Sequence, residues 1–119
     1  MAAREPISVR LEQREGAAIV SVGGEIGYQE APALRNWIRQ AYDKKPEKLV
    51  IDLAGVSYMA TPGLATLVEA LQIAKKTRAR LVLCGLNDRV RAVFEIARLD
   101  TVFVLAPNIE QALETKNES

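Results

Sequence analysis

The 119-residue sequence contains no histidine and only one cysteine, Cys84. Histidine is the commonest general base near neutral pH and the commonest metal ligand, so its absence removes most hydrolase and metal-site chemistry. A single cysteine cannot form an internal disulfide. The sequence therefore predicts neither a metal centre nor a disulfide-stabilised fold, and no cofactor is expected.

Long apolar runs and an excess of one charge are also missing. No apolar stretch approaches the eighteen or more residues of a membrane helix, and residues 1–13 contain no apolar segment of a secretory signal. The 16 basic and 15 acidic residues are interspersed and leave a net charge of +1, so no strong field attracts nucleic acid or an anionic membrane. We expect a cytoplasmic protein with no nucleic-acid partner and no direct membrane insertion.

Hydrophobic residues make up 49% of the chain, which is sufficient for a buried core, and the length is that of one domain. We expect a single domain over residues 1–119, with its core at about 7–113 and a polar tail at 114–119. The hydrophobic patterns predict strands at 7–11, 17–22, 49–53, 81–84 and 102–105, with helices at about 32–43, 61–76, 88–97 and 109–113. This order predicts an α/β fold with a mostly parallel five-stranded sheet and four helices. The alternating first strand should form an antiparallel hairpin with the second and lie at the edge.

The stretch at residues 49–67 is the most informative. A buried strand at 49–53 is followed by a short link at 54–60, and then by Thr61, Pro62 and Gly63. Thr is a favoured N-cap and Pro is common at the first helical position, so a helix is predicted to begin here. We therefore expect the Thr61 hydroxyl to be exposed at the positive end of a helix dipole.

Four other features have a structural interpretation beside a functional one. The Gly-rich residues 23–27 occupy a place where phosphate loops occur but lack their glycine spacing, which favours a tight turn. Asp52 could accept a metal or a phosphoryl group, yet no acidic cluster accompanies it, which favours a role in capping a loop. Cys84 and Trp37 lie within apolar patterns and are predicted to be core residues.

Several weak motifs in a consistent order resemble the STAS domain family, named for sulfate transporters and anti-sigma-factor antagonists. The resemblance runs from about Ile7 to Leu113 and rests on residues 24–26, 50–56, 62–64, 85–94 and 99–103. It implies strands in sequential order with helices mainly on one face. Because buried parallel sheets need two covers, terminal segments and loops should supply part of the second one.

The resemblance also implies a function. In the anti-sigma factor antagonist branch, the unmodified protein sequesters an anti-sigma factor, and phosphorylation by that partner, a serine/threonine kinase, breaks the complex; a cognate phosphatase reverses it. Thr61 matches the phosphoacceptor position and is the candidate phosphosite. The implied partner-binding residues are Gly24, Glu25, Gly27, Tyr28, Ala60, Thr61, Pro62, Gly63 and Leu64. Ala60 and Gly27 stand where the family usually has Asp, which fits a divergent switch, a different kinase, or no phosphorylation.

Two alternatives remain open from the sequence. The chain also resembles some single STAS domains that have Thr at the phosphoacceptor position and serve as cytosolic accessory subunits of ABC transporters that move phospholipids. In that role the Thr61 loop would dock on the ATPase subunit. An enzyme is the weakest alternative, because no nucleophile and base pair, metal cluster or cofactor loop is visible. The expected protein is thus a non-catalytic binding module.

Overall fold

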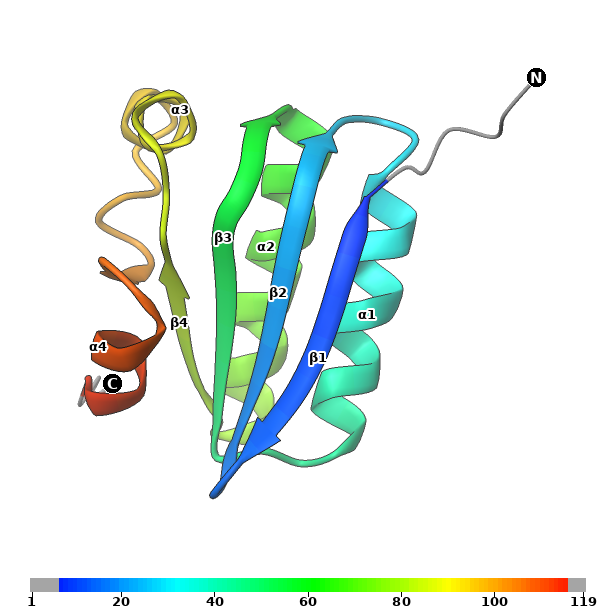
Figure 1. The fold of residues 1–119 in the computed structure, drawn as a ribbon, viewed down its shortest axis with the longest axis vertical. Coiled ribbons are helices and arrows are strands. Elements are labelled where there is room, and N and C mark those ends of the chain that lie inside the picture. The colour runs from blue at the N-terminus through cyan, green and yellow to red at the C-terminus, as the bar shows by residue number, and fades with distance from the viewer. Residues whose placement is uncertain (1–6, 116–119) are drawn as a thin grey trace.

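The computed structural model describes residues 7–115, and within them it has the predicted order of elements (Figure 1). The strands are β1 (Ser8–Arg14), β2 (Ala17–Ile26), β3 (Lys48–Met59), β4 (Arg80–Cys84) and β5 (Val104–Ala106). The helices are α1 (Ala31–Asp43), α2 (Thr61–Thr77), α3 (Asp88–Ile96) and α4 (Ile109–Glu114). The α/β class is therefore confirmed, whereas residues 116–119 of the predicted tail lie outside the described part.

The five strands form one sheet in the order β1-β2-β3-β4-β5. β1 pairs antiparallel with β2, and the other neighbours are parallel. The predicted edge position of the first strand and the sequential strand order are both confirmed. Because the parallel strands all end at the same edge of the sheet, the segments that follow β2, β3 and β4 gather there.

The two faces of the sheet are covered unequally (Figure 1). Alternate residues of each strand point to opposite faces, so Leu49 and Ile51 join the large core under α1, α2 and α3, whereas Val50 joins a smaller cluster. The smaller cluster includes Val82, Cys84 and Ala112, and α4 packs over it. The expectation that a terminal segment covers part of the second face is confirmed.

The two central strands are longer than predicted. The sequence analysis ended the third strand at residue 53 and placed a link at 54–60, but β3 continues to Met59. It does so because β2 also continues, through the glycines expected to form a loop, and pairs Glu25 with Tyr58 and Ile26 with Met59. The register shifts near Gly24, whose φ of 110° few side chains would tolerate. The tight turn predicted for residues 23–27 and the phosphate-loop alternative are therefore both wrong, because β2 runs to Ile26.

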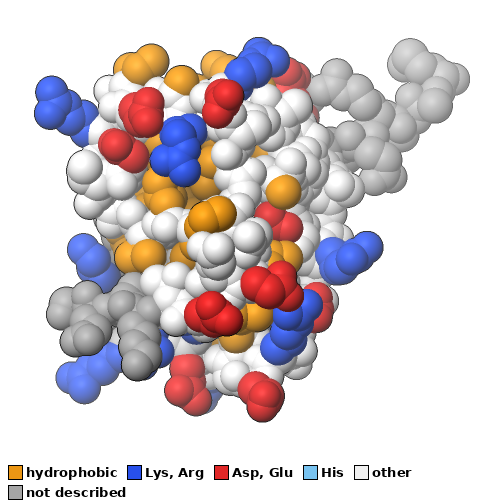
Figure 2. All heavy atoms as spheres, turned by 60° about the vertical axis from the view of Figure 1, so that its left-hand side comes forward, with side chains coloured by type: hydrophobic (Ala, Val, Ile, Leu, Met, Phe, Trp, Pro, Cys, Tyr) orange, Lys and Arg blue, Asp and Glu red, His pale blue; other side chains and the backbone are white. Residues whose placement is uncertain are grey.

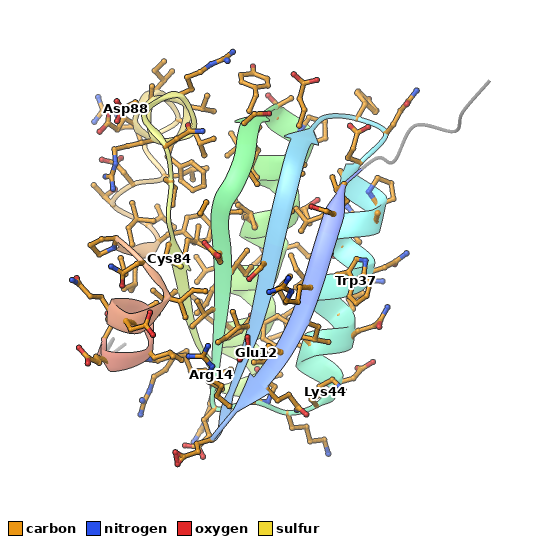
Figure 3. All side chains as sticks on the ribbon, viewed as in Figure 1. Glu12, Arg14, Trp37, Lys44, Cys84 and Asp88 are labelled. Atoms are coloured by element: carbon orange, nitrogen blue, oxygen red, sulfur yellow. The ribbon has the colours of Figure 1, made fainter. Side chains whose placement is uncertain are left out.

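Three smaller differences have local causes. α3 ends at Ile96 rather than residue 97, and Ala97 is exposed. The fifth strand begins at Val104 rather than residue 102, because the Phe103 N–H still donates to the Leu99 carbonyl in the preceding turn. Trp37 is half-buried, not core, since α1 turns Leu34, Ile38 and Ala41 to the sheet and leaves the indole on its flank, as Figure 3 shows.

Candidate functional site

Thr61 is the first residue of α2 and its side chain is exposed. The predicted exposure is thus confirmed, but the predicted N-cap is wrong by one residue. Ala60 occupies the N-cap with an extended backbone, and its carbonyl accepts the N–H groups of Gly63 at 2.9 Å and Leu64 at 3.2 Å. Alanine has no side-chain acceptor, so no side-chain hydrogen bond caps the helix. The Thr61 hydroxyl is consequently not engaged as the helix cap.

The start of α2 is joined directly to the end of β2. The Ala60 N–H donates to the Ile26 carbonyl at 2.8 Å. This bond continues the pairing of Ile26 with Met59 by one step beyond the strands. The segment that follows Ile26 therefore lies beside the segment that contains Thr61, and the two predicted docking segments form one continuous surface.

Glu30 shapes the segment after β2. Its side chain is only 6% exposed, and its Oε1 accepts the Gly27 N–H at 2.9 Å. The Gly27 carbonyl in turn accepts the Ala31 N–H at 3.1 Å, which closes the turn at the start of α1. Tyr28 lies in this turn with 85% of its surface exposed. A large aromatic side chain is thus presented to solvent by a turn that is held closed from within.

The predicted docking residues differ in how far they reach the surface. Gly24, Glu25, Tyr28 and Thr61 are exposed, Gly27, Ala60 and Pro62 are half-buried, and Gly63 and Leu64 are buried. The last two therefore lie beneath the surface, where they support the start of α2, and offer no side chain to a partner. A Cβ on Gly63 would lie 2.7 Å from Met59 Cγ and 2.8 Å from Ile26 Cγ2, so only glycine allows this close approach.

Sequence reasoning missed Tyr58 and Arg89 at the same edge of the sheet. The Arg89 guanidinium carbon lies 5.7 Å from the centroid of the Tyr58 ring. Tyr58 was assigned to a link, where the direction of its side chain was undefined. Beyond Leu53 the buried residues of β3 are Val56 and Met59, a spacing of three that breaks the alternation of a strand and hid its continuation.

The other candidate chemistry has structural explanations. Asp52 Oδ1 accepts the Ala54 N–H at 3.0 Å and lies 3.8 Å from Cys84 Sγ. Because Ala54 belongs to β3 and Cys84 to β4, the predicted role in capping a loop is wrong, and the carboxylate acts within the sheet. Cys84 is fully buried, as predicted, and lies in β4 between the sheet and α4 (Figure 3). Burial, and then the Asp52 carboxylate, raises the pKa of this thiol to about 12. Among residues 7–115, no three His, Cys, Asp or Glu side chains gather as metal ligands.

The fold and the site define a small α/β domain that presents an exposed threonine at a helix start, between the ends of two parallel strands. The sequence profile of the STAS domain matches residues 8–112. This match covers most of the chain, and the chain therefore belongs to the STAS domain family.

Named relatives span nearly the whole chain. It is 33% identical over 112 residues to an anti-sigma-B factor antagonist of Listeria monocytogenes, covering 93% of this chain and 97% of the relative. It is 31% identical over 114 residues to an anti-sigma-F factor antagonist of Mycobacterium tuberculosis, covering 95% and 92%. The crystal structure of an anti-sigma factor antagonist from Mycobacterium paratuberculosis has a TM-score of 0.85 at 30% identity, covering 96% and 97%.

These relatives are named as regulators that oppose another protein factor, which agrees with the prediction that the chain is not an enzyme. In the described part of the chain, no helix has the length and apolar character needed to cross a membrane.

Proposed function

We propose that this protein is an anti-sigma factor antagonist: a non-catalytic, cytoplasmic binding module that sequesters an anti-sigma factor and so releases a sigma factor. The observation that carries the proposal is the exposed Thr61 at a helix start that no side chain caps. The docking surface would combine this helix start with the neighbouring turn that presents Tyr28. The names of the relatives support the same assignment.

Phosphorylation of Thr61 would act as the switch. A phosphate adds about −1.5 to −2 charges at neutral pH and three strong acceptor oxygens. The first turn of α2 contains no acidic residue that would repel it, and the N-terminal end of a helix favours negative charge. Because the Thr61 side chain already faces solvent, the domain accommodates the phosphate without refolding. A partner packed over Thr61 would instead have to accommodate a bulky, strongly hydrated anion, so the complex dissociates.

The proposed partners are an anti-sigma factor of the serine/threonine kinase type and a cognate phosphatase. Ala60 and Gly27 occupy positions where the family usually has Asp, so the kinase would find neither carboxylate on this surface. Glu25, three residues before Tyr28, remains as an exposed acidic side chain and offers a substitute contact. Incubation of the purified pair with ATP, followed by mass spectrometry of the Thr61 peptide, tests whether the kinase still phosphorylates it.

The test of the whole proposal is the affinity for each purified anti-sigma factor of the host genome, measured by titration calorimetry. We expect wild type and Thr61→Ala to bind, and Thr61→Glu to bind at least tenfold more weakly, which corresponds to about 1.4 kcal/mol. Thr101→Glu is the matched control, because Thr101 is an exposed threonine in the turn between α3 and β5. Equal binding by Thr61→Glu and wild type would contradict a role for Thr61 in docking.

The accessory-subunit alternative uses the same surface with another partner. If none of the anti-sigma factors binds, and the purified ATPase subunit of a phospholipid ABC transporter binds in a Thr61-dependent way, the protein is a transporter accessory subunit. In that outcome the antagonist proposal is wrong.

A further inference from the structure

Tyr58 and Arg89 make a contact that lies outside the docking surface proposed above. Tyr58 is the penultimate residue of β3 and is 36% exposed, whereas its neighbour Met59 is fully buried. Arg89 lies in the first turn of α3 and its guanidinium carbon is 5.7 Å from the centroid of the Tyr58 ring. A cation at this distance is attracted to the face of the ring. The guanidinium is therefore held in a defined place while its side chain remains exposed.

Asn87 fixes the start of α3 against the same strand end. Its Nδ2 donates to the Val56 carbonyl of β3 at 2.9 Å, and its Oδ1 accepts the Val90 N–H of α3 at 2.8 Å. One side chain thus caps the helix and attaches it to β3. Because both the backbone of Arg89 and its side chain are held, little conformational entropy remains to be lost when the guanidinium binds a partner.

Arg89 has no acidic partner within residues 7–115. The ion pairs in this part of the chain join Arg14 to Glu12, and Arg35 and Arg39 to Glu69. A guanidinium presents its donors in a planar fork that matches the two oxygens of a carboxylate. Arginine and tyrosine are also the residues most enriched among interface positions that dominate binding energy. The chemistry of the pair therefore favours a protein partner that presents an aspartate or glutamate.

The pair is continuous with the proposed docking surface. Tyr58 is opposite Glu25 in the register of β2 and β3, and it precedes Thr61 by three residues. Figure 1 shows the ends of β2 and β3 and the start of α3 along one edge of the molecule, where Figure 3 labels Asp88. Figure 2 shows hydrophobic side chains at the upper rim next to both basic and acidic side chains.

We propose that Tyr58 and Arg89 form an anchor for a carboxylate-bearing segment of the protein partner, so that the docking surface extends from the Tyr28 turn across Thr61 to the start of α3. This inference rests on the proposed function, since the partner is the same anti-sigma factor. It adds a third contact region, in which the guanidinium of Arg89 selects among partners.

The experiment compares the affinities of Arg89→Gln, Arg89→Lys and Tyr58→Ala for the anti-sigma factor that binds wild type best, by titration calorimetry. Arg89→Gln and Tyr58→Ala should each weaken binding at least tenfold, and Arg89→Lys should fall between Arg89→Gln and wild type because it keeps the charge but not the fork. Arg91→Gln is the matched control: it removes an exposed arginine two residues further along α3 and should change affinity less than twofold. Thermal unfolding of each variant verifies that the fold is retained.

The outcomes separate this inference from the proposed function. If no anti-sigma factor binds wild type, the proposed function and the anchor are both wrong. If wild type binds and Thr61→Glu does not, but Arg89→Gln and Tyr58→Ala bind as tightly as wild type, only the anchor is overturned. A loss of affinity in Arg91→Gln equal to that in Arg89→Gln would also overturn it, since the effect would then come from net charge.

Discussion

Gly63 allows the start of α2 to approach the ends of β2 and β3 at the same time. The positions that a Cβ would occupy are within 2.8 Å of Ile26 and 2.7 Å of Met59, and both of these side chains are fully buried. Real Cβ atoms do not approach so closely, so an alanine would have to push one of these side chains aside or shift the helix. The exposed position of Thr61, two residues earlier, depends on this packing.

Gly63→Ala should therefore destabilise the protein although alanine is the better helix former. Overpacking in a core costs about 1–3 kcal/mol, and the gain in helix propensity is at most about 1 kcal/mol. We expect a net loss of about 1–2 kcal/mol in the free energy of unfolding, measured by urea denaturation. Gly27→Ala is the comparison, because its Cβ would meet one carboxylate oxygen of Glu30, at 3.2 Å, and no buried apolar side chain. A Gly63→Ala variant as stable as wild type would show that the close approach carries no strain.

At the scale of elements, α4 owes its place to a lysine on the second face of the sheet. Lys48 is 6% exposed, and its Nζ donates to the carbonyls of Ala112, Leu113 and Thr115 at 2.9, 3.0 and 2.5 Å. These acceptors are at the C-terminal end of the helix, where positive charge is favourable. Burial, and then the charge on Arg80, lowers the pKa of Lys48. The three hydrogen bonds replace those that the ammonium group made with water, and they connect α4 to β3.

Lys48→Met keeps most of the side-chain volume but removes these donors. We expect a loss of about 1–3 kcal/mol in the free energy of unfolding, since a net hydrogen bond contributes about 1 kcal/mol and the released carbonyls regain water in part. Hydrogen exchange of the α4 amides should accelerate more than that of the α2 amides. Lys44→Met is the control, because Lys44 is exposed, as Figure 3 shows. Unchanged exchange in α4 would mean that apolar packing alone holds it.

Elements were predicted best where the signal is local. The helix starts at residues 88 and 109 were predicted from adjacent residues, and the side chains of Asn87 and Asn108 accept N–H groups in α3 and α4. The extension of β3 was missed because it depends on pairing with β2. In that pairing Tyr58 lies opposite Glu25, which is 33 residues earlier in the chain. The order of elements was thus predictable, whereas contacts between distant segments were not.

The same limit applies to the candidate site. Thr61 could be singled out because the helix signal of Pro62 lies next to it. The sequence could not predict the turn that Glu30 closes or the contact of Arg89 with the Tyr58 ring. Each depends on backbone positions that only the folded sheet defines. Exposure, too, follows from the fold: Leu64 shares the Thr61 segment but is buried in the core.

At the scale of the whole molecule, the unequal covers of the sheet predict how the domain opens. Three helices enclose the larger core, whereas the smaller cluster depends mainly on the six-residue α4. Cys84 belongs to the smaller cluster and is fully buried, so the reactivity of its thiol measures how often this second face opens. A reagent reaches it either when α4 detaches or when the whole domain unfolds.

In the folded protein at pH 8, Cys84 should react with a thiol reagent at least about a thousandfold more slowly than in urea, because stabilities of 5–15 kcal/mol leave few open molecules. Its pKa of about 12, against an ordinary 9.0, adds a pH dependence. Between pH 9 and 12 the unfolded chain releases this proton while the folded chain retains it, so the thiol's contribution to stability is complete below pH 9 and declines above it. Cys84→Ala should reduce that decline.

The rate of this reaction in Lys48→Met distinguishes the two routes of opening. If only global unfolding exposes the thiol, the rate should rise by the factor that the lost free energy of unfolding predicts, tenfold for about 1.4 kcal/mol. We expect a larger rise, because Lys48 fastens the helix that covers Cys84 and its loss favours local detachment over global unfolding. Urea far below the unfolding midpoint should then leave the rate nearly constant, since detaching a short helix exposes little surface. A rate that follows urea with the slope of global unfolding would show that α4 and the sheet open as one unit.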